Sequence, residues 1–370
     1  MFDDVYEPAR DRTVEGRRHA STLLMFAGLA VGDAHADSSR RISEITQTSL
    51  AVTEGALRGY VRFRNGKQPV LESQLLLAML RWAVGQELEL RPETASHARV
   101  TGWLGRQAPM LIRRPQGNTT RAALVSAGVD QYVASNTSKG SACVPRAAGC
   151  SLLYPDVQAL QGTWEAGAHS AALTHGHPVA HAAAGVFATT LRLVREGADP
   201  VGGAFRALEI ASDQNAVTDE HAVAEVAAHL QKAADRSAGG GTYESVEQFG
   251  GWHGRTAEQA LAIAVWAVQR GGDLGDVLKR ATDHGGERRS TGAAAGALWG
   301  ALTGRHHADR AENSIAFDAP APHPLDELPD DLRPRSDELA LVEAVAEDAA
   351  RLLRAGSAIE YADRVRWPGW

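Results

Sequence analysis

Apolar residues recur at spacings of three and four in several long segments of this chain, and this periodicity constrains the fold most strongly. Such spacing places the apolar side chains on one face of a helix. Alanine, which has the highest helix propensity, is abundant in these segments. They span residues 71–84, 182–194, 222–230, 257–268 and 339–353. Because no run of useful length alternates apolar and polar residues, the sequence predicts an all-α protein.

The length of the chain allows one large domain or two to three smaller ones. It has 370 residues, of which 44% are hydrophobic, so it can bury a large core. No break in composition separates two halves. We expect a single compact domain of packed helices over residues 12–370, preceded by an N-terminal extension, residues 1–11. Its core should contain Trp82, Trp266 and Trp299.

Charge and cysteine content exclude several classes of protein. The net charge of −7, with no cluster of Lys and Arg interleaved with aromatic residues, argues against nucleic-acid binding. Cys143 and Cys150 are the only cysteines and fit neither a disulfide framework nor a metal knuckle, so two buried thiols are expected. The apolar run 23–31 is shorter than the ~20 residues that span a bilayer. We expect a cytoplasmic protein without a membrane partner.

Two short stretches near opposite ends of the chain carry its most distinctive pattern. Residues 43–47 read Ser-Glu-Ile-Thr-Gln, and residues 285–292 read Gly-Gly-Glu-Arg-Arg-Ser-Thr-Gly. Together with the run 28–34, they resemble the ADP-ribosylglycohydrolase family, which usually has Ser/Thr-Asp-Asp-Thr-Gln and Gly-Asp-Ser-Asp-Ser/Thr-Thr-Gly at these places. The loop 138–148 and the turn 173–178 are also similar to family sequences. The order and spacing of these matches extend the resemblance over almost the whole chain.

The resemblance implies a helical fold with its site in a central cleft. In that family the two stretches face each other and hold a pair of magnesium ions, which grip the ribose while water cleaves a glycosidic bond of an ADP-ribosyl group. The resemblance also implies that the loop Ser138, Lys139, Gly140 and Ser141 contacts the diphosphate and ribose. It places Asp33 near the ribose, although the residue pattern alone predicts that Asp33 caps the following turn.

The chain departs from the family where the metal ligands should stand. The acidic ligands are replaced by Glu44, Ile45, Glu287 and Arg289. Magnesium requires near-octahedral oxygen ligands, whereas Ile45 offers no oxygen and Arg289 adds a fixed positive charge. We therefore expect magnesium binding to be weak or absent. At most one weak ion would lie near four residues: Ser43, Glu44, Glu287 and Ser290.

The remaining polar residues define a candidate site for chemistry. Glu44, Glu287 and Asp33 are the candidate catalytic residues, and Glu44 or Glu287 could act as a general base for water. Arg288 and Arg289 present planar forks suited to a phosphate group. In a second interpretation, Arg289 forms a salt bridge with Glu44 or Glu287 that fills the vacant metal position without any function.

Three other features leave alternatives open. His175 and His177 could chelate a metal, but a structural corner whose imidazoles bond to backbone carbonyls is favoured. The glycines at 239–241 fit a flexible connection or a mobile lid. The segment His35 to Ile42 is shorter than the covering loop of most family members, so a more open cleft is expected.

Two classes of function follow from these observations. In the first, the protein hydrolyses an N-ribosyl bond, which is an N-glycosidic bond, of a small phosphorylated nucleotide-like substrate with altered or lost magnesium dependence. In the second, it is a catalytically inactive pseudoenzyme that binds ADP-ribose-like ligands or a protein partner. The sequence favours residual chemistry because the replacements keep two carboxylates, Glu44 and Glu287.

Overall fold

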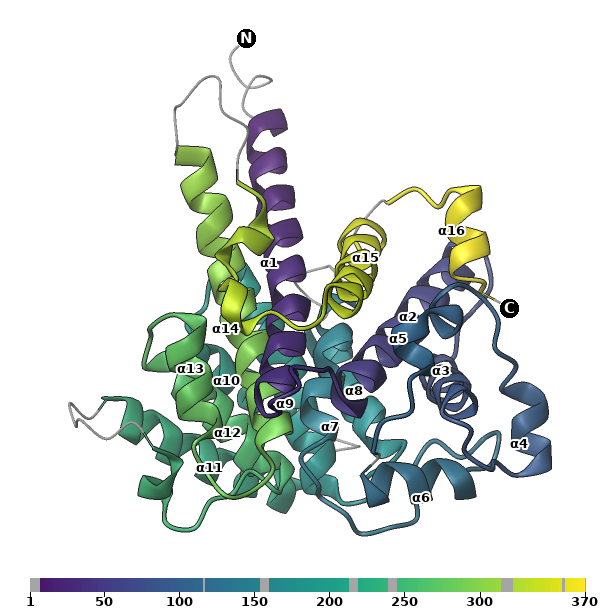
Figure 1. The fold of residues 1–370 in the computed structure, drawn as a ribbon, viewed down its shortest axis with the longest axis horizontal. Coiled ribbons are helices and arrows are strands. Elements are labelled where there is room, and N and C mark those ends of the chain that lie inside the picture. The colour runs from purple at the N-terminus through teal and green to yellow at the C-terminus, as the bar shows by residue number, and fades with distance from the viewer. Residues whose placement is uncertain are drawn as a thin grey trace.

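The computed structural model describes residues 7–115, 117–153, 160–212, 219–238, 245–313, 322–354 and 357–369, and helices joined by loops make up this part of the chain (Figure 1). The α-helices are α1 (Glu7–His35), α2 (Glu44–Arg64), α3 (Leu71–Gly85), α4 (Pro92–His97), α5 (Ala108–Leu111), α6 (Asn118–Ser126), α7 (Cys143–Arg146), α8 (Leu160–Ala172), α9 (Pro178–Glu196), α10 (Pro200–Ser212), α11 (Glu220–Ala238), α12 (Ala257–Gln269), α13 (Leu274–Thr282), α14 (Arg288–Asn313), α15 (Ser336–Leu352) and α16 (Tyr361–Arg366). Short 3₁₀ helices are η1 (Leu104–Arg106), η2 (Ala147–Leu152), η4 (Val246–Phe249), η5 (Pro324–Glu327) and η6 (Asp330–Leu332). No strand occurs in the described ranges, where a single antiparallel bridge joins Gly140 and Thr256.

Helices α1 and α14 pack side by side through the centre of the molecule (Figure 1). Glycines make the contact close enough for backbone to meet backbone. A Cβ added to Gly28 would lie 2.1 Å from the carbonyl oxygen of Gly296, and one added to Gly32 would lie 2.0 Å from that of Gly292. The helices therefore run antiparallel, which brings the C-terminal end of α1 beside the N-terminal end of α14. These are the two ends that carry Asp33 and Arg289.

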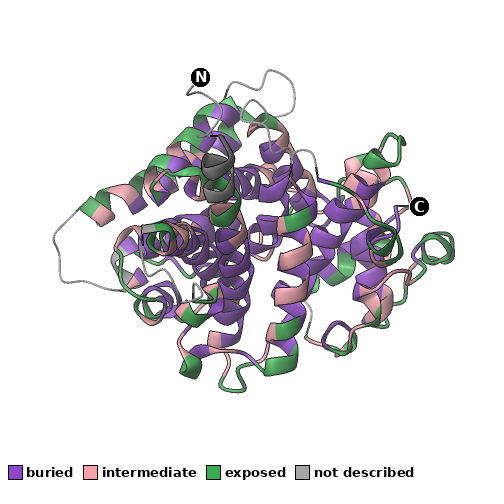
Figure 2. Cartoon of the chain, turned by 90° about the horizontal axis from the view of Figure 1, so that it is seen from above, coloured by how far each residue is buried: buried purple, intermediate pink, exposed green. Residues whose placement is uncertain are grey.

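The five periodic segments of the sequence form parts of α3, α9, α11, α12 and α15, as predicted. Figure 2 shows that buried residues fill the interior of this helical assembly. Trp82, Trp266 and Trp299 are buried, and so are the free thiols of Cys143 and Cys150. The all-α fold and its tryptophan core are thus confirmed.

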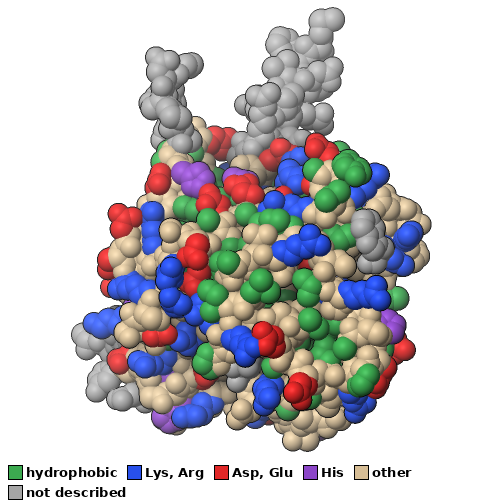
Figure 3. Space-filling view, turned by 45° about the vertical axis from the view of Figure 1, so that its right-hand side comes forward, with side chains coloured by type: hydrophobic (Ala, Val, Ile, Leu, Met, Phe, Trp, Pro, Cys, Tyr) green, Lys and Arg blue, Asp and Glu red, His purple; other side chains and the backbone are tan. Residues whose placement is uncertain are grey.

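Several other expectations meet the structure only in part. Helix α1 already begins at Glu7, inside the stretch expected to be an N-terminal extension. The glycines at 239–241 lie outside the described residues. Within the described part of the chain, no helix combines the length and apolar character needed to cross a bilayer. Figure 3 shows basic and acidic side chains interspersed over one face rather than gathered by sign.

Candidate functional site

A cavity of about 530 Å³ lies where the N-terminal ends of α2 and α14 meet. The two distinctive stretches of the sequence are far apart in the chain, but both line this cavity, as the resemblance implies. Helix N-termini carry partial positive charge, which favours a negatively charged group near this cavity. The predicted site residues that line the cavity are Ser43, Glu44, Gly140, Ser141, Glu287, Arg289 and Ser290, together with Ile45.

Asp33 is fully buried and serves as the cap of α2. One carboxylate oxygen accepts hydrogen bonds from the Ser43 amide at 2.6 Å, the Thr46 amide at 3.2 Å and the Thr46 hydroxyl at 2.7 Å. The other accepts from the Ser43 hydroxyl at 2.6 Å. Asp33 thus satisfies donors of the first turn of α2, whose N-cap is Ser43, rather than those of the turn that directly follows it, and it does not itself line the cavity.

Arg289 pairs with aspartates rather than with glutamates. Its Nη2 lies 2.8 Å from Asp37 Oδ2, and its Nη1 lies 3.4 Å from Asp33 Oδ1. The predicted salt bridge to Glu44 or Glu287 is therefore wrong in its partners, because no sequence pattern indicates that Asp37 lies beside Arg289. Hydrogen bonds from Ser39 and the charge of Arg289 lower the pKa of Asp37 to about 2.

Glu44 is buried in the cavity wall with only half of its carboxyl group satisfied. Oε1 accepts a hydrogen bond of 2.6 Å from the Gly117 amide. Oε2 is buried and has no hydrogen-bond partner among the described residues. Burial raises the pKa of Glu44 to about 7, and the charges of Asp33 and Glu287 act in the same direction. This carboxyl group is poised to exchange a proton near neutral pH.

Two further groups from the second stretch face the same space. The hydroxyl of Ser290 is buried, lines the cavity and has no partner among the described residues. Glu287 is partly exposed, and its charge is close enough to act on Glu44. Buried polar groups normally find a hydrogen-bond partner. The orphan oxygens of Glu44 and Ser290 therefore mark a place where water or a ligand completes the network.

The loop 138–141 reaches the cavity with only part of its residues. Gly140 and Ser141 line it, whereas Ser138 bonds to Thr119 at 3.2 Å. Lys139 is held away by ion pairs with Glu225 and with Glu258, the latter at 3.1 Å. Lys139, Ser138 and Arg288 are not among the described residues that line the cavity, and Arg288 is exposed.

A set of cationic and hydroxyl groups that no sequence pattern predicted also lines the cavity. Arg114 lies 2.5 Å from Glu338, which also accepts a hydrogen bond from the Ile42 amide. No local motif marks these residues, because their position depends on contacts between distant segments. The missed lining residues that matter chemically are Arg41, Arg114, Arg255, Thr119 and Thr120.

His175 and His177 form the structural corner that the sequence favoured, but with different partners. His177 Nδ1 accepts a hydrogen bond from the Val179 amide and so caps α9. His175 bonds to the Thr174 hydroxyl at 2.8 Å, and burial, aided by Arg146 and His181, lowers the pKa of His175 to about 3. The imidazole that contacts a backbone carbonyl is that of His181. No group of three or more metal-binding side chains occurs among the described residues.

Comparison with known proteins agrees with this geometry. The ADP-ribosylglycohydrolase family matches residues 16–312 of the chain. No curated protein matches it. A solved structure described as an "ADP-ribosylglycohydrolase-related protein complex" has a similar fold, with a TM-score of 0.57 and 21% sequence identity over 91% of this chain and 99% of that chain. With both distinctive stretches inside the matched region and facing one cavity, the chain belongs to the ADP-ribosylglycohydrolase family.

Proposed function

We propose that this protein hydrolyses the N-ribosyl bond of a small phosphorylated nucleotide-like substrate, with Glu44 as the general base and without a pair of magnesium ions. The observation that carries the proposal is the Glu44 carboxyl group. Its Oε2 is buried and unpartnered in the cavity wall, and its pKa is raised to about 7. A general base works best when its pKa lies near the operating pH.

The chemistry requires one base and one stabilising charge. Glu44 Oε2 takes a proton from a water molecule, whose oxygen forms a bond to the anomeric carbon. The C–N bond breaks, and its electron pair leaves with the nitrogen. The transition state resembles an oxocarbenium ion, which the Glu287 carboxylate stabilises across the cavity. A pyridinium leaving group departs neutral and needs no proton, so a pyridine nucleotide suits a site with a single base.

Recognition of phosphate rests on several positive features of the cavity. The N-terminal ends of α2 and α14 direct their dipoles toward it. Arg41 and Arg255 line its wall in addition to Arg289, which is already paired with Asp33 and Asp37. A volume of about 530 Å³ also falls in the range of small-ligand sites.

The residues present do not fit a magnesium pair. Both oxygens of Asp33 accept hydrogen bonds from the first turn of α2, and Glu44 Oε1 accepts one from the Gly117 amide. Ile45 supplies no oxygen, and the Arg289 guanidinium already stands beside Asp33 as the counter-charge. Hard divalent cations need six or more oxygen ligands, several of them from protein or substrate. We therefore assign the role of the cation near Asp33 to Arg289.

The same ion pairs also favour a second function. Arg289 neutralises both Asp33 and Asp37, which removes two carboxylates from any chemistry. A pseudoenzyme that binds ADP-ribose-like ligands would need only the cavity, the helix N-termini and the loop at Gly140 and Ser141.

A panel of ligands separates the two functions. Purified protein would be incubated with NAD, nicotinamide mononucleotide, ADP-ribose and ADP-ribosyl-arginine in the presence of a chelator. Chromatography would follow product release, and calorimetry would follow binding. Release of nicotinamide from nicotinamide mononucleotide supports the proposed hydrolase. Saturable binding without turnover of any compound selects the pseudoenzyme, and turnover that appears only when magnesium is added contradicts the metal-independent mechanism.

A further inference from the structure

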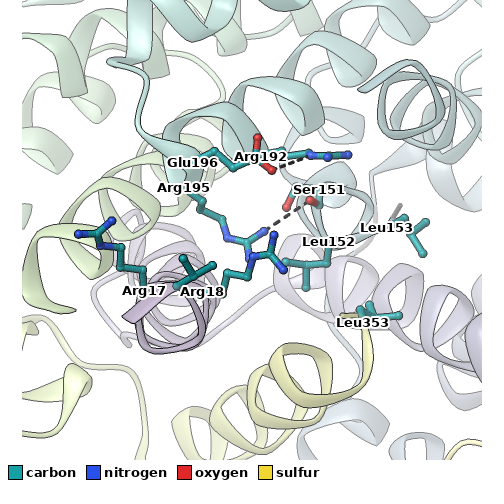
Figure 4. A pocket seen from close by; sticks show the side chains of 10 residues that line it. Arg17, Arg18, Ser151, Leu152, Leu153, Arg192, Arg195, Glu196 and Leu353 are labelled. Carbon is teal, nitrogen blue, oxygen red and sulfur yellow. Dashed lines mark hydrogen bonds and ion pairs between the residues drawn. The ribbon is translucent and has the colours of Figure 1, made fainter. Parts of the chain in front are cut away.

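A second cavity, of about 170 Å³, lies beside the N-terminal half of α1 (Figure 4). It is lined by α1, by the end of η2, by α9 and by Leu353, which follows α15. Arg18, in this cavity, and Asp33 are fifteen residues apart on α1, a distance of about 22 Å at the rise of an α-helix. The two cavities share no lining residue and are therefore separate.

Positive charge in this second cavity exceeds its negative charge. Arg192 is buried and pairs with Glu196 at 3.0 Å. Arg17 pairs with Asp309, and Figure 4 shows its side chain extending away from the others. Arg18 and Arg195 form no ion pair with an acidic side chain among the described residues, although the charge of Glu196 acts on Arg195. Figure 4 shows their guanidinium groups together below Ser151.

Among the described residues, Arg195 donates hydrogen bonds only to neutral oxygens. Its Nη2 lies 3.1 Å from the Thr22 hydroxyl, and its Nη1 lies 3.5 Å from the Ser151 carbonyl oxygen. Its Nε is buried without a partner. Burial lowers the pKa of Arg195 to about 10; the charge of Glu196 opposes this shift, and the charges of Arg18 and Arg192 add to it. A guanidinium that is crowded by like charges and keeps a spare donor has the chemistry of an oxyanion receptor.

We propose that this cavity is a second ligand site that binds a phosphate group between Arg18 and Arg195. Leu152, Leu153 and Leu353 form an apolar wall beside these arginines. The cavity is smaller than the usual range for whole small-molecule ligands, so it suits free phosphate or the terminal phosphate of a phosphomonoester rather than an entire nucleotide. The inference goes beyond the proposed hydrolase activity, because it concerns a different cavity and different residues.

Calorimetric titration of the full chain at low ionic strength tests the site. The probes are inorganic phosphate and ribose 5-phosphate. The probe that binds with the higher affinity identifies the source of the phosphate group. We expect saturable binding, a loss of at least tenfold in affinity in Arg18→Gln, and a smaller loss in Arg18→Lys, which keeps the charge. Arg206→Gln is the matched control, because it removes one exposed arginine on α10.

The same titration on Arg289→Gln, a variant of the first cavity, separates the two sites. The affinity of this variant for phosphate at the second cavity should equal that of the wild type. Absence of saturable binding in the wild type overturns the proposal. So does equal affinity in Arg18→Gln and Arg206→Gln. Neither outcome bears on the hydrolase, because turnover is not measured.

Thermal unfolding distinguishes a ligand site from a structural role of Arg18. In phosphate-free buffer, Arg18→Gln should be at least as stable as the wild type, because the substitution relieves repulsion from Arg195. Addition of phosphate should raise the melting temperature of the wild type and leave that of Arg18→Gln unchanged. A variant that is clearly less stable without phosphate, and that still responds to it, contradicts the proposal.

Discussion

Asp33 and Glu44 lie in neighbouring parts of the same site, yet their surroundings give them opposite roles. Asp33 accepts four hydrogen bonds from the first turn of α2 and faces Arg289. Glu44 accepts one hydrogen bond and has a buried oxygen without a partner among the described residues. This difference is the basis of our proposal that Asp33 serves the fold, whereas the desolvated and half-satisfied carboxyl group of Glu44 serves the chemistry.

The largest effect should follow from removing the proton acceptor. Glu44→Gln keeps the shape and the Gly117 contact but cannot take a proton from water. We expect turnover to fall by about 100-fold to 10,000-fold, the usual contribution of a general base. Steady-state hydrolysis of nicotinamide mononucleotide measures it, with Glu209→Gln on the exposed face of α10 as the control. Equal activity in the two variants would assign the base to another residue.

The matching change at Asp33 should act on stability. Asp33→Ala leaves the buried donors of Ser43 and Thr46 without their acceptor and Arg289 without one partner. We expect a loss of about 2–4 kcal/mol in the free energy of unfolding. Urea denaturation at neutral pH gives this value. If Asp33→Ala unfolds like the wild type, the division of roles between the two carboxylates is wrong.

The sequence predicted individual helices better than the contacts between distant segments. Periodicity located α3, α9, α11, α12 and α15 because each buries one local apolar face. The hydrogen bond between Glu44 and Gly117, by contrast, joins residues 73 positions apart. The ion pairs of Lys139 with Glu225 and Glu258 likewise depend on α11 and α12, which pack beside the loop. Such long-range contacts leave no periodic signal in the chain.

The raised pKa of Glu44 also determines how the stability of the fold depends on pH. The pKa of Glu44 is raised from 4.5 to about 7 by burial, so between these values the folded state holds a proton that the unfolded state releases. Stability should therefore fall as the pH rises through this window. Glu44→Gln removes this penalty, and it should be more stable than the wild type by about 1–3 kcal/mol above pH ~7 and equal to it below pH ~4.5. Urea unfolding at both extremes tests this, and a pH-independent difference contradicts the raised pKa.

The smallest effect is expected at Arg289. Its side chain is 31% exposed, so solvent screens its ion pairs with Asp33 and Asp37. We expect Arg289→Ala to lower the free energy of unfolding by about 1 kcal/mol or less. Because the hydrogen bonds from Ser39 contribute most to the lowered pKa of Asp37, that pKa should rise only in part, which NMR titration of the carboxylate would detect. A loss of stability as large as that of Asp33→Ala would show that Arg289 and the cap form one structural unit.

The role of Glu44 as a general base is tested most directly by the pH profile of kcat/KM for nicotinamide mononucleotide, measured in the presence of a chelator. A base with a pKa of about 7 must lose its proton before it can act, so kcat/KM should rise with pH and level off above an inflection near 7. The inflection should vanish in Glu44→Gln. Activity abolished by the chelator and restored by magnesium, or a profile without an inflection near neutral pH, would contradict the claim that Glu44 is the base of a magnesium-independent hydrolase.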